Sequence, residues 1–276
     1  MSPEQEYYNK ISTVLGTIGT VLWCVQLIPQ IYTNFRRKST EGLSASMFLL
    51  WAAAGVLFGM YFIVQHTSIA LMVQPEIFTF LSLVTMSQCL YYGCKYSIFK
   101  TIAITISFAV LSAGLQLAAI IPLQKSSLYK NDPTPTCWPL LLIGILAALC
   151  IVVGLMPPYF ELARNKGQVI GINFVFLAID SSGAVLSFAS LLFPQTLANG
   201  VELKKDIVGM VLYCIIPVME GGIMLSHLVW YIRLGRHHHD HPVDKFEKCV
   251  STDDDVEHVS TLARTVSYCS PRFSRV

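Results

Sequence analysis

The chain has 276 residues, of which 54% are hydrophobic and only 13% are charged. A soluble domain carries about 25% charged residues, so this composition excludes an ordinary soluble protein and indicates an integral membrane protein. The formal net charge of +2 gives no reason to expect a nucleic-acid partner. Most of the eight cysteines fall within or at the end of apolar stretches, which argues against a disulfide framework.

Residues 1–10 are polar and mildly acidic, and the apolar segment behind them is too long for a cleaved signal peptide. Seven segments are long enough to cross about 30 Å of hydrocarbon as helices. They cover residues 11–35, 44–64, 73–94, 98–121, 138–160, 170–192 and 207–232. The sequence therefore predicts an all-α membrane protein with seven transmembrane helices and with its termini on opposite sides of the membrane.

An internal repeat relates the first three spans to the last three. At a separation of about 128 residues Pro157 falls on Pro29, and after one extra loop residue Gly171 falls on Gly42. Because repeats fix architecture, we expect two three-helix units joined by a linker helix. The predicted divisions are a lumenal tail at 1–10, the first repeat at 11–94, the linker and a lumenal loop at 95–137, the second repeat at 138–235 and a disordered cytosolic tail at 236–276.

The distribution of Lys and Arg predicts the orientation. With the N-terminus lumenal or extracellular, fourteen basic residues lie on the cytosolic side and five on the other. The positive-inside rule therefore places the C-terminus in the cytosol. Both triplets then have the same orientation, which is a parallel repeat about an axis along the membrane normal.

The polar tail is predicted to carry no fold of its own, because it cannot bury enough apolar surface. Its histidine run at 237–241 could bind a metal, but a solvated low-complexity segment is the more frequent explanation. We predict no metal site and no cofactor. Short motifs around Ser267 and Ser270 could be phosphorylated, and the tail could bind sorting factors.

Asp180 is the residue most typical of a functional site in a membrane. It lies about ten residues into the span 170–192, roughly 15 Å deep at 1.5 Å per residue, near the bilayer midplane. An ionised carboxylate there is costly unless it faces water or a partner. We therefore predict that Asp180 couples proton movement. The structural alternative is a protonated side chain that joins two helices by a hydrogen bond.

Glu220 and His227 are further titratable residues within a predicted helix. Their seven-residue spacing places them on roughly one helix face, where a carboxylate and an imidazole could relay protons. Both belong to the predicted proton-coupling set. The alternative is equally well supported by the sequence: Glu220 lies toward the lumenal interface, and His227 is a packing residue.

Four uncharged amides are predicted to bind substrate. Gln26 and Gln30 flank Pro29 on the first span. Gln88 lies in the third span, and Asn173 lies near the start of the sixth. Amides in a helix bundle serve either as substrate partners or as interhelical hydrogen bonds, and the second role is the more frequent one. Both roles therefore stay open.

Proline breaks lie near the predicted cytosolic ends of the first and fifth spans. A proline inside a helix removes one backbone hydrogen bond and crowds the carbonyl four residues earlier, which for Pro29 is that of Val25. In lipid the freed carbonyl needs a protein partner or water. We therefore predict hinges at Pro29 and at the pair Pro157 and Pro158.

The arrangement of two triplets around a linker, with Pro29–Gln30 followed by the run Arg36–Ser44, resembles the PQ-loop family. That family includes cystinosin, vacuolar and lysosomal amino-acid transporters, the SWEET sugar transporters and, by fold, the KDEL receptor. The resemblance covers roughly residues 11–232. In the second motif Pro158 stands where the family usually has Gln.

The resemblance implies that Pro29 and Pro157 let the triplets alternate between lumen-open and cytosol-open states, and that Asp180 couples protons as in the cystinosin branch. We expect a transporter, not an enzyme, that moves a small polar metabolite such as an amino acid out of a vacuole-like or lysosome-like organelle. Its expected partners are that substrate, protons and the lipid bilayer, and a homo-oligomer is compatible with the sequence. The alternatives are a sorting or nutrient-sensing receptor on the same fold and a scaffold acting through its tail.

Overall fold

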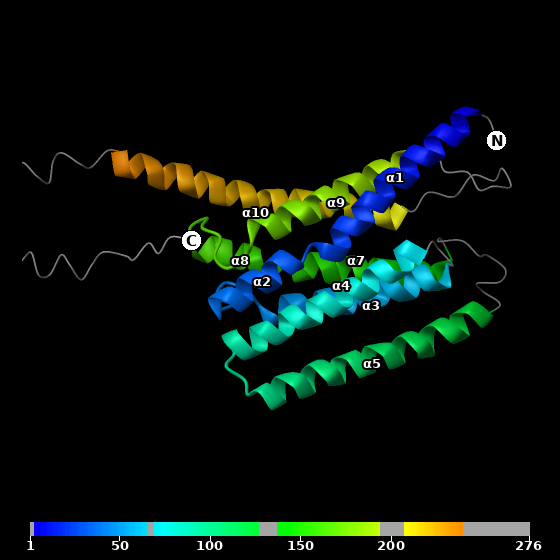
Figure 1. Cartoon of the computed structure of the whole chain (residues 1–276), viewed down its shortest axis with the longest axis horizontal. Coiled ribbons are helices and arrows are strands. Elements are labelled where there is room, and N and C mark those ends of the chain that lie inside the picture. Colours follow the sequence, from blue (N-terminus) through cyan, green and yellow to red (C-terminus); the bar gives the residue numbers. More distant parts are fainter. Residues whose placement is uncertain (1–2, 66–68, 127–136, 194–206, 240–276) are drawn as a thin grey trace, which may run out of the picture. The chain divides into compact units, whose positions relative to one another are not determined.

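The computed structural model describes residues 3–65, 69–126, 137–193 and 207–239, and the regular structure within these residues is helical. Residues up to Trp230 form one unit, to which the packing below refers. In chain order the helices are α1 (Pro3–Val25), α2 (Ile28–Arg37), α3 (Ala45–Val64), α4 (Ile69–Gln88), η1 (Cys89–Gly93), α5 (Ile98–Lys125), α7 (Trp138–Gly154), α8 (Met156–Arg164), α9 (Phe174–Leu192) and α10 (Ile207–His239) (Figure 1).

Each predicted span corresponds to a helix or to a broken pair of helices, so the all-α membrane class is confirmed. Among the described residues, six spans are long and apolar enough to cross a membrane. The seventh is α4, which has 20 residues but a more polar composition that includes Gln74, Glu76 and Gln88. Its polar side chains face other helices or the interior, so α4 still fits a span surrounded by protein.

Two helix ends differ from the predicted boundaries. Helix α1 begins at Pro3, inside the predicted tail 1–10, because proline suits the first turn of a helix and Glu4 and Glu6 complement its positive end. An ion pair of 2.7 Å between Glu6 and Lys10, four residues apart, joins this turn to the next one. Helix α10 continues to His239, so the predicted tail 236–276 starts as helix; residues 240–276 lie outside the described residues.

The first and fifth spans are broken at equivalent places of the repeat. Helix α1 ends at Val25 and α2 begins at Ile28, while α7 ends at Gly154 and α8 begins at Met156. In both cases the new helix carries proline in its first turn, where the missing N–H costs no intrahelical bond. The third span ends differently, in the π-helical turn η1. Proline therefore starts the second half of each broken span.

The helices of the two triplets interleave. Helix α3 packs against α4, α5 and α7, whereas α1 packs against α9 and α4. Since α3 is apolar on all sides, it supplies much of the core, including the fully buried Trp51 and Tyr61. Helix α5 lies beside α3 (Figure 1) and leaves apolar side chains such as Val110 and Leu111 exposed, as expected for a linker helix in contact with lipid.

Candidate functional site

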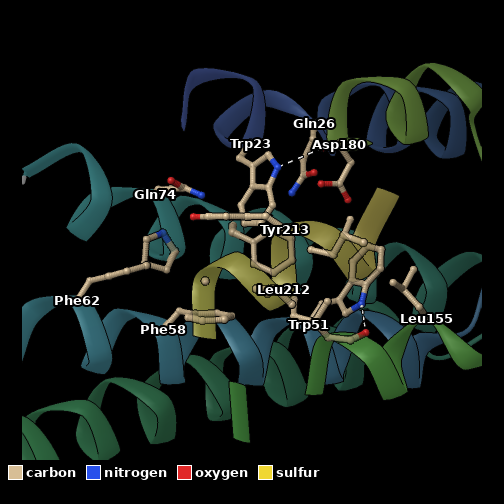
Figure 2. A pocket seen from close by; sticks show the side chains of 15 residues that line it. Trp23, Gln26, Trp51, Phe58, Phe62, Gln74, Leu155, Asp180, Leu212 and Tyr213 are labelled. Carbon is tan, nitrogen blue, oxygen red and sulfur yellow. Dashed lines mark hydrogen bonds between the residues drawn. The ribbon is translucent and has the colours of Figure 1, made fainter. Parts of the chain in front are cut away.

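A pocket lies where the two triplets meet. Its walls come from α1 and the turn behind it, α3, α4, α7 with its break, α9 and α10, and the linker α5 contributes none of its lining (Figure 2). The lining residues are Trp23, Gln26, Trp51, Phe58, Phe62, Gln74, Pro75, Phe78, Ile151, Leu155, Asp180, Gly209, Leu212, Tyr213 and Ile216. An apolar pocket with a few convergent polar groups is the usual form of a small-molecule site.

Asp180 is the charged residue of this lining, and it is 6% exposed. The amide of Gln26, in the orientation that satisfies both groups, donates to Oδ2 of Asp180 at 3.0 Å and also to Oδ1. The indole Nε1 of Trp23 donates to the backbone carbonyl of Asp180 at 3.2 Å (Figure 2). Because Gln26 lies in the turn between α1 and α2, the proline break places this amide against the carboxyl group.

Glu220 of α10 lies next to Asp180, and its side chain is fully buried. The carboxyl groups of Glu220 and Asp180 lie close enough to share a hydrogen bond. The hydroxyl of Ser181 donates to Oε2 of Glu220 at 2.6 Å, while Oε1 receives no hydrogen bond from the described residues. A carboxylate can only accept, so a hydrogen bond between two carboxyl groups requires one of them to be protonated. The pair can therefore hold one proton.

His227 is not the partner of Glu220. Seven residues correspond to roughly 10 Å along a helix, and the imidazole Nδ1 instead accepts a hydrogen bond of 3.1 Å from the backbone N–H of Val169. Its ring stacks on Trp230 with centroids 5.3 Å apart and also contacts Phe174. The structure thus brings Asp180 and Glu220 together, and it places His227 against the loop before α9. A proton-coupling role for His227 stays a prediction.

The predicted hinge prolines lie at the breaks beside the pocket. Pro29 is the second residue of α2, and Pro157 and Pro158 are the second and third residues of α8. Gln26, just before α2, and Leu155, just before α8, both line the pocket. The breaks predicted at the prolines are therefore present in the structure, and the hinge motion stays a prediction.

All four predicted substrate amides make hydrogen bonds to the protein, and that of Gln26 is to Asp180. Gln30 accepts from the backbone N–H of Asn173 at 2.7 Å and donates to the carbonyl of Gly171 at 3.0 Å. Gln88 donates to the carbonyl of Ile31 at 3.0 Å. These bonds tie the broken first span to α9 and α4, so the geometry of Gln30 and Gln88 favours the interhelical role.

Asn173 is the N-cap of α9 and also contacts the broken span. Its Oδ1 accepts from the backbone N–H of Val175 at 2.8 Å, which satisfies one unpaired donor of the helix start. Its Nδ2 donates to the hydroxyl of Thr33 at 2.7 Å. Of the four predicted amides, Gln26 alone lines the pocket.

Two polar residues of α4 were not predicted as site residues. Gln74 lines the pocket, is 5% exposed and makes no hydrogen bond to the described residues. Glu76 is not part of the lining, and its Oε1 accepts from Nε2 of Gln116 on α5 at 2.8 Å. Their position inside a span was the available signal, because polar and ionisable residues are rare within transmembrane helices. No group of three or more metal-ligating side chains occurs among the described residues.

The sequence resembles known membrane proteins to different extents. A family model described as PQ loop repeat matches residues 11–71. The chain is 39% identical over 259 residues to the uncharacterized membrane protein YDR090C of Saccharomyces cerevisiae, covering 89% of this chain and 79% of that protein. It is 34% identical over 84 residues to the vacuolar lysine transporter YPQ1 of the same yeast, covering 30% and 27%. It is 41% identical over 56 residues to the lysosomal amino acid transporter 1 homolog of Homo sapiens, covering 20% and 19%.

Proposed function

The chain belongs to the PQ-loop repeat family of membrane proteins, and from that premise we propose that it transports a small polar metabolite of the amino-acid class out of an acidic organelle. Two partial relatives are named as a vacuolar lysine transporter and a lysosomal amino acid transporter. Those names support transport across a vacuolar or lysosomal membrane, and the amino-acid class of the substrate is taken from them.

The observation that carries the proposal is a pocket between two repeats with a carboxyl group in its wall. Asp180 and Gln26 line the pocket beside the α1–α2 break, and Leu155 lines it at the α7–α8 break. At each break the backbone hydrogen bonding of one helix ends before that of the next begins, so the span bends more easily there than a continuous helix would. Bending at both breaks would move α2 and α8 and open the pocket toward one side, as alternating access requires.

Proton coupling is assigned to the pair Asp180 and Glu220. Two buried carboxyl groups in hydrogen-bond contact hold a proton between them, because two adjacent negative charges in a membrane are costly. A pocket open to an acidic lumen would load this proton, and a pocket open to a near-neutral cytosol would release it. The gradient then gives substrate movement its direction.

The proposed orientation places the N-terminus in the lumen and the C-terminus in the cytosol. It rests on the excess of Lys and Arg, of which Arg36, Arg37 and Arg164 lie in the last turns of α2 and α8. The broken ends of both spans then face the cytosol. Protease protection of tags before Pro3 and after His239 in sealed vesicles tests this orientation, and two tags on one side would contradict it.

Uptake into liposomes that contain the purified protein tests the function. With acidic buffer outside and neutral buffer inside, we expect radiolabelled amino acids to accumulate above the external concentration. A protonophore should reduce uptake to equilibration. Uptake that ignores the gradient would contradict proton coupling, and specific binding without any flux would contradict transport and favour the receptor alternative.

A further inference from the structure

We propose that the pocket recognises the positive charge of an organic cation and needs no carboxylate on its ligand, so that an amine binds at least as tightly as the amino acid from which it derives. This inference rests on the proposed function, because it concerns the substrate of the same pocket. It narrows the ligand from a small polar metabolite to a monovalent ammonium compound with an apolar or aromatic body.

Aromatic side chains form a large part of the lining. They are Trp23, Trp51, Phe58, Phe62, Phe78 and Tyr213, drawn from α1, α3, α4 and α10. Trp23 and Tyr213 meet edge to face with ring centroids 5.3 Å apart, and the hydrogen bond of the Trp23 indole to α9 fixes its orientation. Ring faces attract ammonium groups, and such cages are a common means of binding organic cations.

The polar groups of the pocket suit a cation better than a carboxylate. Among the lining residues the charged side chain is Asp180, and none is Lys, Arg or His. The indole N–H groups of Trp23 and Trp51 already donate to backbone carbonyls, at 3.2 and 3.3 Å. A ligand carboxylate would thus lie near Asp180 and Glu220 without a positive partner, and such a placement is repulsive.

Gln74 supplies an independent indication of a bound ligand. Its amide is nine-tenths buried, belongs to the pocket wall and makes no hydrogen bond to the described residues (Figure 2). An amide of the pocket wall that has no protein partner is available to a ligand, so Gln74 can bind a polar atom of the ligand.

The two adjacent carboxyl groups let a cation and a proton bind together. Glu220 can keep a proton while the Asp180 carboxylate faces the ammonium group, because Asp180 lines the pocket and Glu220 is fully buried behind it. Cation recognition is therefore compatible with movement of substrate and proton in the same direction.

Binding to the purified full-length protein at about pH 7.5 tests the inference. Titration calorimetry should compare histidine with histamine, tyrosine with tyramine, and choline with its neutral isostere 3,3-dimethyl-1-butanol. We expect each amine to bind at least as tightly as its parent amino acid, and the quaternary cation to bind while the neutral compound does not. Amino acids that bind when their amines do not would overturn the inference, as would binding of neither class.

A matched pair of phenylalanine variants adds a control for folding. Phe58→Leu removes a ring from the pocket, whereas Phe48→Leu removes a buried ring that does not line it. Losing one ring face should weaken cation binding about threefold to fivefold in Phe58→Leu and leave it unchanged in Phe48→Leu. Equal affinities in the two variants, at similar thermal midpoints, would overturn the role of the cage.

The liposome assay separates the two proposals. Flux of amino acids without amine binding would overturn the cation inference and leave transport standing. Amine binding without flux of any compound would contradict transport and leave the cation site standing.

Discussion

Two helix pairs, α1 with α9 and α3 with α7, are joined by the same kind of interaction. In each pair a tryptophan indole donates to a backbone carbonyl, and we call this hydrogen bond a brace. In the first pair Nε1 of Trp23 donates to the carbonyl of Asp180 at 3.2 Å, and in the second Nε1 of Trp51 donates to the carbonyl of Ile151 at 3.3 Å. The repeat alignment makes Trp23 equivalent to Ile151 and Trp51 equivalent to Asp180. The two hydrogen bonds therefore occupy equivalent places, with indole and carbonyl exchanged between repeats.

Each indole also lies on a glycine three residues beyond its carbonyl partner. A methyl group added at Gly183 would collide with Trp23, and one added at Gly154 would lie 2.5 Å from Cδ1 of Trp51. Where the two braces differ is in chemistry: the residue that accepts is an acid in α9 and an isoleucine in α7. The comparison indicates that packing is shared by both repeats, while the carboxyl pair of Asp180 and Glu220 belongs to α9 and α10.

The largest expected effect comes from removing the acid that distinguishes the first brace. Asp180→Asn keeps the size of the side chain and its hydrogen bonding but cannot titrate, so we expect pH-driven accumulation to fall to equilibration. Exchange of substrate across the membrane by Asp180→Asn should persist when the pH is equal on the two sides. Liposome uptake with and without a gradient measures both.

Glu76→Gln is the matched control, since Glu76 is also a carboxylate inside a span but bonds to Gln116 of α5 and does not line the pocket. Its accumulation should equal that of the wild type. If Asp180→Asn concentrates substrate as well as Glu76→Gln does, Asp180 is a structural residue and coupling must lie elsewhere.

The sequence predicted the spans and breaks because these depend on local properties. Apolar runs of about 20 residues define a membrane helix, and Pro29 and Pro157 mark the breaks through their missing N–H groups. The predicted midplane position of Asp180 likewise depends only on its place within one span. These features need no knowledge of how helices are rotated against each other.

The pairing of Asp180 with Glu220 could not be predicted in the same way. The two residues are 40 positions apart on different helices, and periodicity shows which face of a helix a residue occupies but not which neighbour meets that face. Same-helix spacing therefore suggested His227 as the partner of Glu220. The place of Gln74 in the pocket wall could not be predicted either, because the pocket is formed by groups from several helices.

The second prediction concerns the loops behind the two breaks, where the repeats come into backbone contact. Gly42 and Gly171 are equivalent, both have positive φ (78° and 82°), and a methyl group on either would collide with a carbonyl of the opposite loop. Gly42→Ala and Gly171→Ala should each raise the free energy of the arrangement in which the two loops touch by about 1–3 kcal/mol. Spin labels attached at positions 37 and 164 should then lie farther apart, as measured by pulsed electron paramagnetic resonance.

Gly167→Ala separates strain from collision. Gly167 also has positive φ, at 97°, but the nearest atom to an added methyl group is 3.3 Å away and belongs to the side chain of Ser226. We expect the label distance in this variant to match that of the wild type. Equal lengthening in all three variants would mean that backbone strain, and not contact between the loops, separates them.

The third prediction tests whether the two braces contribute equally to stability. In Gly183→Ala and Gly154→Ala the added methyl group collides with an indole ring and displaces it. We expect each substitution to lower the free energy of unfolding by about 1–3 kcal/mol. Gly114→Ala on α5 meets no atom within 4 Å and should stabilise the protein by about 0.5–1 kcal/mol. Chemical denaturation in detergent measures all three.

Transport measurements should distinguish Gly183→Ala from Gly154→Ala even though the two variants are equally destabilised. Displacing Trp23 moves the backbone of Asp180, whereas displacing Trp51 moves that of Ile151. Gly183→Ala should therefore lose more pH-driven accumulation than Gly154→Ala at equal stability. Equal losses would show that the position of the acid does not depend on the indole.

The smallest effect is expected at Ser181, which makes one hydrogen bond to the Asp180–Glu220 pair. Its hydroxyl donates to Oε2 of Glu220 at 2.6 Å, while Ser182, its neighbour on α9, is exposed and has no such contact. A hydrogen bond of this kind contributes about 1 kcal/mol, so Ser181→Ala should slow coupled uptake roughly fivefold. Ser182→Ala should leave the rate unchanged. Because both carboxyl groups remain in each variant, each should reach the wild-type level of accumulation at long times, and only the rate should separate them. A lower final level in Ser181→Ala would mean that the hydroxyl helps to hold the proton itself, which would extend the coupling site from two residues to three.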